Sequence, residues 1–135
     1  MKFWNRVCII VSMIVVVSKW WMKWIASLVY RLKGSDEVFA AQSFFIFIIL
    51  REKDFQNCER LIRHERIHFW QQLEMLFIGQ WVLYLIFYFA NLIRYKDHKI
   101  AYRMNPFEKE AFMNDHNPNY LLERKPLGWT KYVRW

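Results

Sequence analysis

Glycine, proline and cysteine are all scarce in this chain. Its 135 residues include three Gly, three Pro and two Cys. So few turn-forming residues leave few turns available and predict long helices. Cys8 and Cys58 have no C-x-x-C spacing, which argues against a zinc ribbon, a redox pair or a structural disulfide. The sequence also has no internal repeat, Gly-rich phosphate loop or low-complexity linker.

Acidic residues are outnumbered as well, with 12 Asp and Glu against 20 Lys and Arg, a net charge of +8. The chain is 56% hydrophobic and 20% aromatic, and it includes eight Trp. Basic charge together with abundant Trp favours an anionic membrane surface as a partner. Nucleic acid is disfavoured, because the basic residues flank apolar runs and form no separate polar stripe. The length predicts one compact domain.

Two apolar segments suggest membrane association. The run Val7–Val17 follows Lys2 and Arg6, and no small-residue cleavage site comes after it. We interpret residues 1–33 as an uncleaved, membrane-associating helix that inserts or lies in the interface, with Trp side chains in the headgroup zone. Residues 34–135 would then form the folded domain.

The second segment, Met75–Ile93, contains no charged residue. As a helix it would be about 28 Å long, close to the ~30 Å thickness of a bilayer core. We expect it to contact a bacterial inner membrane, as an integral or a peripheral element, although a helix buried against the N-terminal segment remains an alternative. Basic residues at both ends leave the topology open.

The most informative motif is H-E-x-x-H, formed by His64, Glu65 and His68. No Gly or Pro interrupts residues 55–78, so the spacing predicts a helix, with Asp54 or Asn57 as its N-cap. On a helix, positions i and i+4 share a face, and two such imidazoles can bind one metal ion. We expect this helix to run directly into the apolar segment.

A catalytic zinc site needs a third protein ligand. Asn105 followed by Pro106 predicts a helix start, with Glu108 and Glu110 in the first turns and pointing in different directions. Glu108 fits the ligand role best.

These motifs resemble the zincin metallopeptidases of the gluzincin type, H-E-x-x-H followed by E-x-x-A. The pattern maps onto His64, Glu65 and His68, and then onto the run Glu108-Lys-Glu-Ala111. The family usually has Asp at the position of Phe112. The chain is also similar to short uncharacterised bacterial proteins of Bacteroides type that are membrane-associated.

The resemblance implies a minimal zincin-like domain that is mainly α (α+β), with peptide or protein as its substrate. It implies zinc held by His64, His68 and Glu108, with Glu65 as the catalytic base. Further residues would support the metal ligands or stabilise the oxyanion, and the candidates are Gln72, Tyr102, Glu110 and His98. The apolar run Phe44–Leu50 is expected to be a strand at the edge of the substrate cleft.

Simpler readings exist for each of these features. The histidines could be surface residues of a basic helix, and the glutamates could favour a helix N-terminus electrostatically. The alternative functions are therefore a non-catalytic membrane protein, or a pseudo-enzyme or accessory subunit with a vestigial metal site. The sequence leaves the oligomeric state open.

Overall fold

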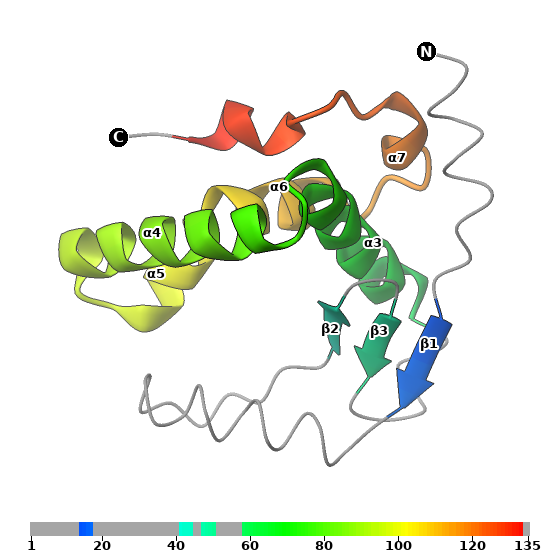
Figure 1. Ribbon diagram of the computed structural model, residues 1–135, viewed down its shortest axis with the longest axis horizontal. Helices are drawn as coiled ribbons and strands as arrows, with labels where there is room; N and C mark the ends of the chain where they lie inside the picture. Colours follow the sequence, from blue (N-terminus) through cyan, green and yellow to red (C-terminus); the bar gives the residue numbers. More distant parts are fainter. Residues whose placement is uncertain (1–13, 18–40, 45–46, 51–57, 134–135) are drawn as a thin grey trace.

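The computed structural model describes residues 14–17, 41–44, 47–50 and 58–133, and this part of the chain is mainly helical, as predicted. Figure 1 shows a layer of helices beside a small sheet. The helical elements are α3 (Glu59–Glu74), α4 (Ile78–Tyr95), α5 (His98–Arg103), α6 (Pro106–Asn114), α7 (Tyr120–Glu123) and the 3-10 helix η2 (Gly128–Tyr132).

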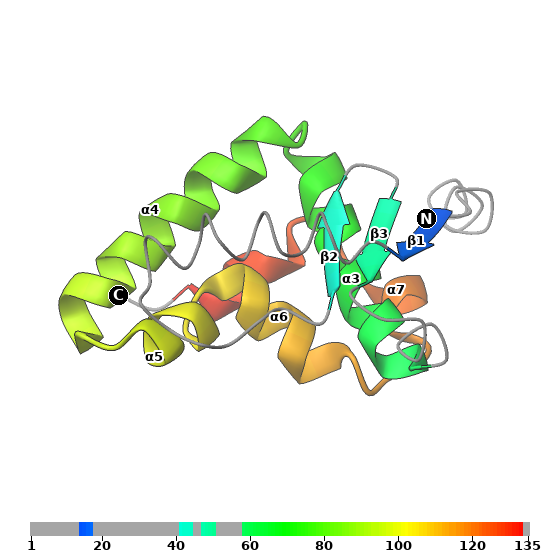
Figure 2. The same ribbon diagram turned by 90° about the horizontal axis from the view of Figure 1, so that it is seen from below.

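The sheet has the strand order β1-β3-β2. Strand β3 (Phe47–Leu50) is the central one, parallel to β1 (Ile14–Val17) and antiparallel to β2 (Ala41–Phe44). The single strand expected over Phe44–Leu50 is therefore wrong in detail, because Phe44 ends one strand and Phe47 begins the next. Strand β2 lies closest to α3 (Figure 2).

Strand β1 replaces the helix expected over residues 1–33 at the four positions that the structure describes. Its sequence is Ile-Val-Val-Val, and the stiff, β-branched side chains favour a strand. The rest of that segment and the domain boundary at residue 33 lie outside the described residues.

Helix α3 begins at Glu59, with Cys58 at the N-cap position and no side-chain cap. The predicted caps Asp54 and Asn57 lie outside the described residues, and neither occupies this position. The acidic Glu59 in the first turn interacts favourably with the helix dipole. The helix buries a mixed face, with Ile67 and Phe69 among the apolar residues and both histidines among the polar ones.

The expectation that α3 runs directly into the apolar helix is wrong. The two helices meet at 111° across Met75–Phe77, and Figure 1 shows the sharp turn. Leu76 and Phe77 have φ values of 51° and 61°, which end the helical path. The Phe77 amide closes the turn by donating to the Gln72 carbonyl at 2.6 Å.

The bend bears on the predicted membrane span. Among the described residues, no single helix combines the length and the hydropathy needed to cross a bilayer. Helices α3 and α4 have the necessary length and hydropathy only when taken together, as a pair broken by the bend.

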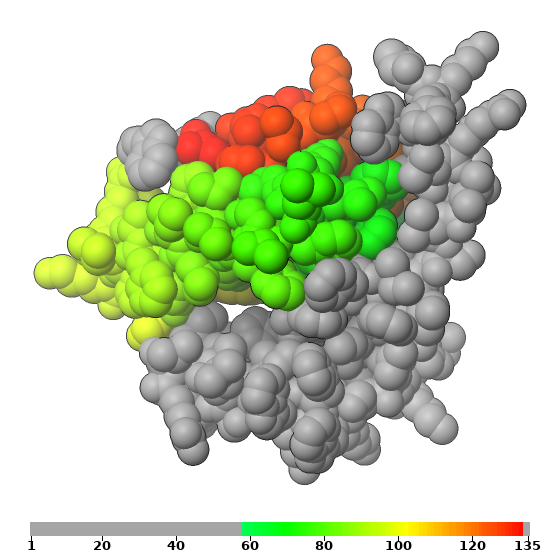
Figure 3. All heavy atoms as spheres, viewed as in Figure 1, coloured from blue at the N-terminus to red at the C-terminus, as the bar shows by residue number. Residues whose placement is uncertain are grey.

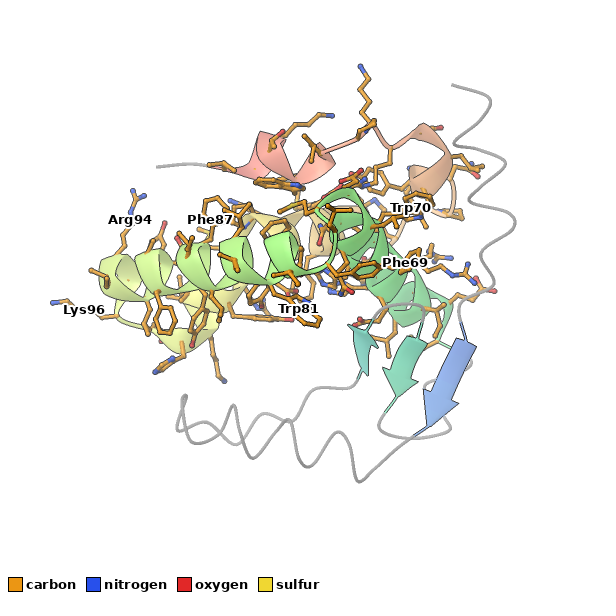
Figure 4. The ribbon with its side chains drawn as sticks, viewed as in Figure 1. Phe69, Trp70, Trp81, Phe87, Arg94 and Lys96 are labelled. Atoms are coloured by element: carbon orange, nitrogen blue, oxygen red, sulfur yellow. The ribbon has the colours of Figure 1, made fainter. Side chains whose placement is uncertain are left out.

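An aromatic cluster holds α4, α6 and η2 together. Phe107 on α6 is fully buried, and its ring lies 4.7 Å from that of Trp129 and 6.2 Å from that of Phe87. Phe87 lies on the side of α4 that faces η2 (Figure 4). Packing at Phe107 fixes the first turn of α6, where Glu108 follows directly.

Candidate metal centre

Helix α3 presents both histidines of the motif to the interior. His64 and His68 are buried one turn apart, and their Nε2 atoms are 3.2 Å from each other. Their rings meet edge to face at 4.9 Å. The predicted i, i+4 pairing is therefore confirmed.

The third group comes from α6. Asn105 occupies the N-cap and its Oδ1 accepts from the Phe107 amide, with Pro106 as the first helical residue, so the predicted helix start is confirmed. Glu108 in the first turn is buried and directed at the histidines. Its Oε2 lies 3.5 Å from His64 Nε2 and 3.4 Å from His68 Nε2.

These three atoms form a nearly equilateral triangle with sides of 3.2, 3.4 and 3.5 Å. A tetrahedral ion separates its ligands by 1.63 times the metal–ligand distance, which for zinc at 2.0–2.1 Å is about 3.3–3.4 Å. The triangle matches that spacing. The group of His64, His68 and Glu108 could therefore hold a metal ion, with a fourth tetrahedral position left over.

The outer nitrogen of His68 has a defined partner. Its Nδ1 lies 2.8 Å from Oε1 of Gln71. The Gln71 amide nitrogen donates to the Phe107 carbonyl at 3.0 Å and to Glu110 Oε2 at 2.8 Å, so its oxygen must face the imidazole. Nδ1 of His68 therefore carries the hydrogen, and the Nε2 lone pair points into the triangle.

Asp115 keeps the hydrogen of His64 on Nδ1, as Gln71 does for His68. Its Oδ2 lies 3.3 Å from His64 Nδ1, and its Oδ1 accepts from Arg60 at 2.7 Å. Arg63 donates to the Asp115 backbone carbonyl at 2.8 Å. A carboxylate behind a ligating imidazole fixes the ring and raises its basicity. Nε2 is thus the atom that each histidine would offer to a metal.

In comparisons with known proteins, no family model, no curated protein and no solved structure matches this chain. The arrangement of these side chains is therefore what supports a function.

Two tyrosines interact with Glu108. Tyr84 on α4 donates to Oε1 at 2.9 Å. Burial and the neighbouring Glu108 charge hold the pKa values of Tyr84 and Tyr102 well above 10. A hydrogen bond with Glu108 contributes to the Tyr102 shift. Both phenols are therefore neutral donors near pH 7. The Oε2 of Glu108, by contrast, makes no hydrogen bond within the described residues.

The charges in the triangle are strongly coupled. Burial alone lowers the pKa of His68, but the charge and hydrogen bond of Glu108, together with the Glu65 charge and the Gln71 hydrogen bond, raise it from 6.5 to about 9. Burial alone raises the pKa of Glu108, but the charges and hydrogen bonds of His68 and His64 together hold it well below its ordinary value. A proton and a metal cation would therefore compete for the same lone pairs.

Glu65, the predicted base, is buried beside the triangle. Its charge raises the pKa of both His68 and Tyr102, so its carboxylate lies near each of them. The site thus combines the three candidate ligands, a second carboxylate and a neutral phenol.

Glu110 and Gln72, which were predicted to support the ligands or the oxyanion, have other surroundings than expected. Glu110 is fully buried away from the triangle, where it accepts from Arg124 at 2.6 Å and from Tyr120 at 2.8 Å. Gln71 links it to the site by donating to Glu110 Oε2 at 2.8 Å. Gln72 is buried and closes the turn after α3 with its backbone carbonyl, while its neighbour Gln71 contacts His68.

The remaining histidines lie elsewhere. His98 Nδ1 lies 2.7 Å from the Tyr88 hydroxyl, one turn beyond Tyr84 along α4, and His116 is exposed. His98 therefore has a partner of its own, and Tyr102 is the predicted oxyanion candidate that contacts the site.

The contacts of Asp115 with His64, of Gln71 with His68 and of Tyr84 with Glu108 were not predicted. Asp115 follows Glu108 by seven residues, two helical turns on the same face, and Gln71 follows His68 by three. Both spacings are readable from the sequence. Phe112 packs edge-on against His64, with the ring centroids 4.6 Å apart. Nothing in the sequence indicates Tyr84, because its position depends on the bend between α3 and α4.

Proposed function

We propose that this chain is a zinc-dependent peptide hydrolase with a minimal zincin-like domain. The observation that carries the proposal is the triangle of His64 Nε2, His68 Nε2 and Glu108 Oε2, whose sides suit one tetrahedral ion. Two imidazoles and one carboxylate form a ligand set typical of catalytic zinc. The proposed zincin-like domain includes the small β element that precedes α3.

The ion would supply Lewis acidity, polarising a carbonyl and lowering the pKa of a water in its open position toward neutrality. The protein supplies the rest. Asp115 and Gln71 keep the hydrogens of His64 and His68 on Nδ1. Buried Glu65 would accept a proton from the attacking water and return it to the leaving amine.

Tyr102 suits the role of an oxyanion donor. Its phenol is protonated at neutral pH and can donate a hydrogen bond, and the raised pKa extends this to higher pH. A donor directed at the developing negative charge stabilises the transition state. Tyr102 contacts the site from α5, a different element from those that carry the candidate ligands.

Strand β2 suits the binding of an extended peptide. Within the described residues it pairs with β3 on one edge and packs near α3. Its second edge can accept a substrate backbone as an added strand. The strand expected for this role, Phe44–Leu50, is mostly β3, which is paired on both edges.

A structural metal site without catalysis is the second candidate. It is favoured by burial, since the side chains of His64, His68 and Glu108 are only 9%, 10% and 7% exposed. Structural zinc sites are closed, whereas catalytic sites keep an open position. The pseudo-enzyme alternative belongs to this candidate.

Metal analysis and peptide cleavage assays separate these functions. We expect about one zinc per chain, as three protein ligands define one ion. His64→Ala and Glu108→Ala should lose the metal, while the matched variants His116→Ala and Glu123→Ala, at exposed positions, should retain it.

Glu65→Gln distinguishes catalysis from a structural role. It should retain zinc and abolish cleavage of an unstructured protein substrate such as casein. Full activity in Glu65→Gln would refute the peptidase mechanism. Zinc binding by the wild-type chain with no cleavage of casein or of a mixed peptide library would favour the structural site.

A further inference from the structure

Helix α4 has an unusual distribution of polar and apolar side chains. Its inward stripe is polar, with Gln80, Tyr84, Tyr88 and Asn91 directed at the protein. Three of these side chains make tertiary hydrogen bonds, to Glu108, to His98 and to the Ala101 carbonyl. A surface helix of a water-soluble domain normally has the opposite arrangement.

Phe87 packs inward against Phe107 and Trp129, but many apolar side chains of α4 point outward. Six of them lie 51–79% exposed, and together we name them the outer face of α4: Ile78, Val82, Leu85, Ile86, Phe89 and Ile93. At 100° per residue they form a stripe about 100° wide, directly opposite the polar stripe. Figure 3 looks onto this helix and shows its side chains at the surface.

Basic charge borders the outer face at one end without entering it. No charged residue occurs between Met75 and Ile93, while Arg94, Lys96 and Lys99 are exposed just beyond its end. Figure 4 shows Arg94 and Lys96 at the end of α4 distant from α3. Trp81 is 36% exposed at the margin of the stripe, and indole rings favour the headgroup region.

We propose that the outer face of α4 docks onto an anionic lipid bilayer, with the helix axis parallel to the membrane plane. Basic residues beside an apolar stripe complement the negative charge of such a surface. A second copy of this chain is a poorer occupant, because both copies carry a net charge of +8. The 111° bend sets α3 at a steep angle to α4, so α4 can lie flat while α3 extends into the protein.

This orientation fixes where the metal centre lies. Tyr84, on the inward stripe of α4, donates to Glu108 of the triangle. The candidate ligands are thus separated from the lipid by α4 itself, about 10 Å in diameter. Protein segments that emerge from the bilayer surface would be the substrates nearest to the site. The docking itself does not depend on the proposed hydrolase activity.

The test uses the full chain with environment-sensitive NBD labels at single cysteines, in a Cys8→Ser, Cys58→Ser background. The label is placed at Phe89→Cys on the outer face or, as a matched control, at Met113→Cys, which is 58% exposed on α6. Vesicles consist of phosphatidylcholine with or without phosphatidylglycerol. A site-specific label is needed because residues 1–33 are predicted to bind lipid on their own.

Adding anionic vesicles should shift the emission at Phe89→Cys to the blue, and lipid-borne nitroxides should quench it. The label at Met113→Cys should change little. The shift should weaken at high salt and without phosphatidylglycerol. The triple variant Val82→Gln, Leu85→Gln, Phe89→Gln should lower the fraction that floats with vesicles relative to Met113→Gln, Leu122→Gln.

Three results would overturn the docking proposal. The first is an unchanged label at Phe89→Cys on a chain that floats with the vesicles, and the second is the absence of vesicle binding. The third is a blue-shifted label before lipid is added, with cross-linking between chains at position 89, which would assign the outer face to a second copy. Removing zinc should leave the label signal unchanged, so failure of the hydrolase proposal would be distinguishable.

Discussion

Replacing Asp115 by asparagine tests how the protein prepares His64 for a metal. Arg60 donates to Oδ1 of Asp115, and a guanidinium can only donate. The new amide must therefore turn its oxygen to Arg60 and its NH2 group to Nδ1 of His64. That nitrogen would have to accept a hydrogen bond, which moves the imidazole hydrogen to Nε2, the atom that should bind the metal.

The expected loss follows from the geometry. Removing the group that orients a ligating histidine typically weakens metal binding by about 10–100-fold. The Oδ2–Nδ1 distance of 3.3 Å is longer than the ~2.7–2.9 Å of a short charge-assisted bond, so we expect the lower part of that range. A loss of about 10–30-fold corresponds to roughly 1.4–2.0 kcal/mol.

Competition with a fluorescent zinc chelator measures this change. Glu59→Gln is the matched control, because it removes one negative charge from an 87% exposed side chain beside Arg63. In an Arg60→Met background the amide at position 115 can turn its oxygen back to His64, and the loss should shrink. Equal zinc affinities for Asp115→Asn and Glu59→Gln would refute the reasoning.

Three further predictions concern the charges and the packing around the site. The pKa of His68 is raised from 6.5 to about 9, so this group stabilises the metal-free protein fully below pH 6.5 and progressively less as the pH rises to about 9. Differential scanning calorimetry should show that the Tm of the metal-free protein falls over this pH window. Zinc affinity should rise over the same window, because the competing proton leaves. A Tm that does not change with pH would contradict the coupling between His68 and Glu108. Gly128→Ala should destabilise by about 1–3 kcal/mol in urea unfolding, because its Cβ would lie 2.6 Å from Glu110 Oε1. Gly79→Ala, whose Cβ meets only Met75 at 3.4 Å, should be neutral or stabilising by about 0.5–1 kcal/mol, and similar losses in both would count against the clash. Arg124→Met should cost about 3–5 kcal/mol, because the buried carboxylates of Glu74 and Glu110 lose their shared cation, whereas the exposed Lys125→Met should cost little.

Local spacing was enough to predict the parts of the site that lie within one helix. The i, i+4 histidines share a face of α3, and Asn105-Pro106 begins α6, because each depends only on helix geometry and capping. Glu108, and not Glu110, faces the histidines; Glu110 lies two positions along α6 and points at Arg124. The convergence of α3 and α6 itself required tertiary structure.

The features that the sequence did not predict depend on contacts between elements. The bend at Leu76 and Phe77 uses positive φ values at two bulky residues, where no glycine or proline indicates a break. The expected helix at Ile14–Val17 is a strand, because pairing with β3 decides the conformation of a short apolar run. The partner of His68 is Gln71 and not Gln72, since a one-residue step turns a side chain by 100° around the helix.

Anomalous diffraction at the zinc absorption edge, from crystals of the zinc-loaded chain, would locate the metal directly. We expect a single peak about 2.0–2.1 Å from His64 Nε2, His68 Nε2 and Glu108 Oε2. A peak on Cys58 or His116, or no peak beside these three side chains, would contradict the assignment of the metal centre.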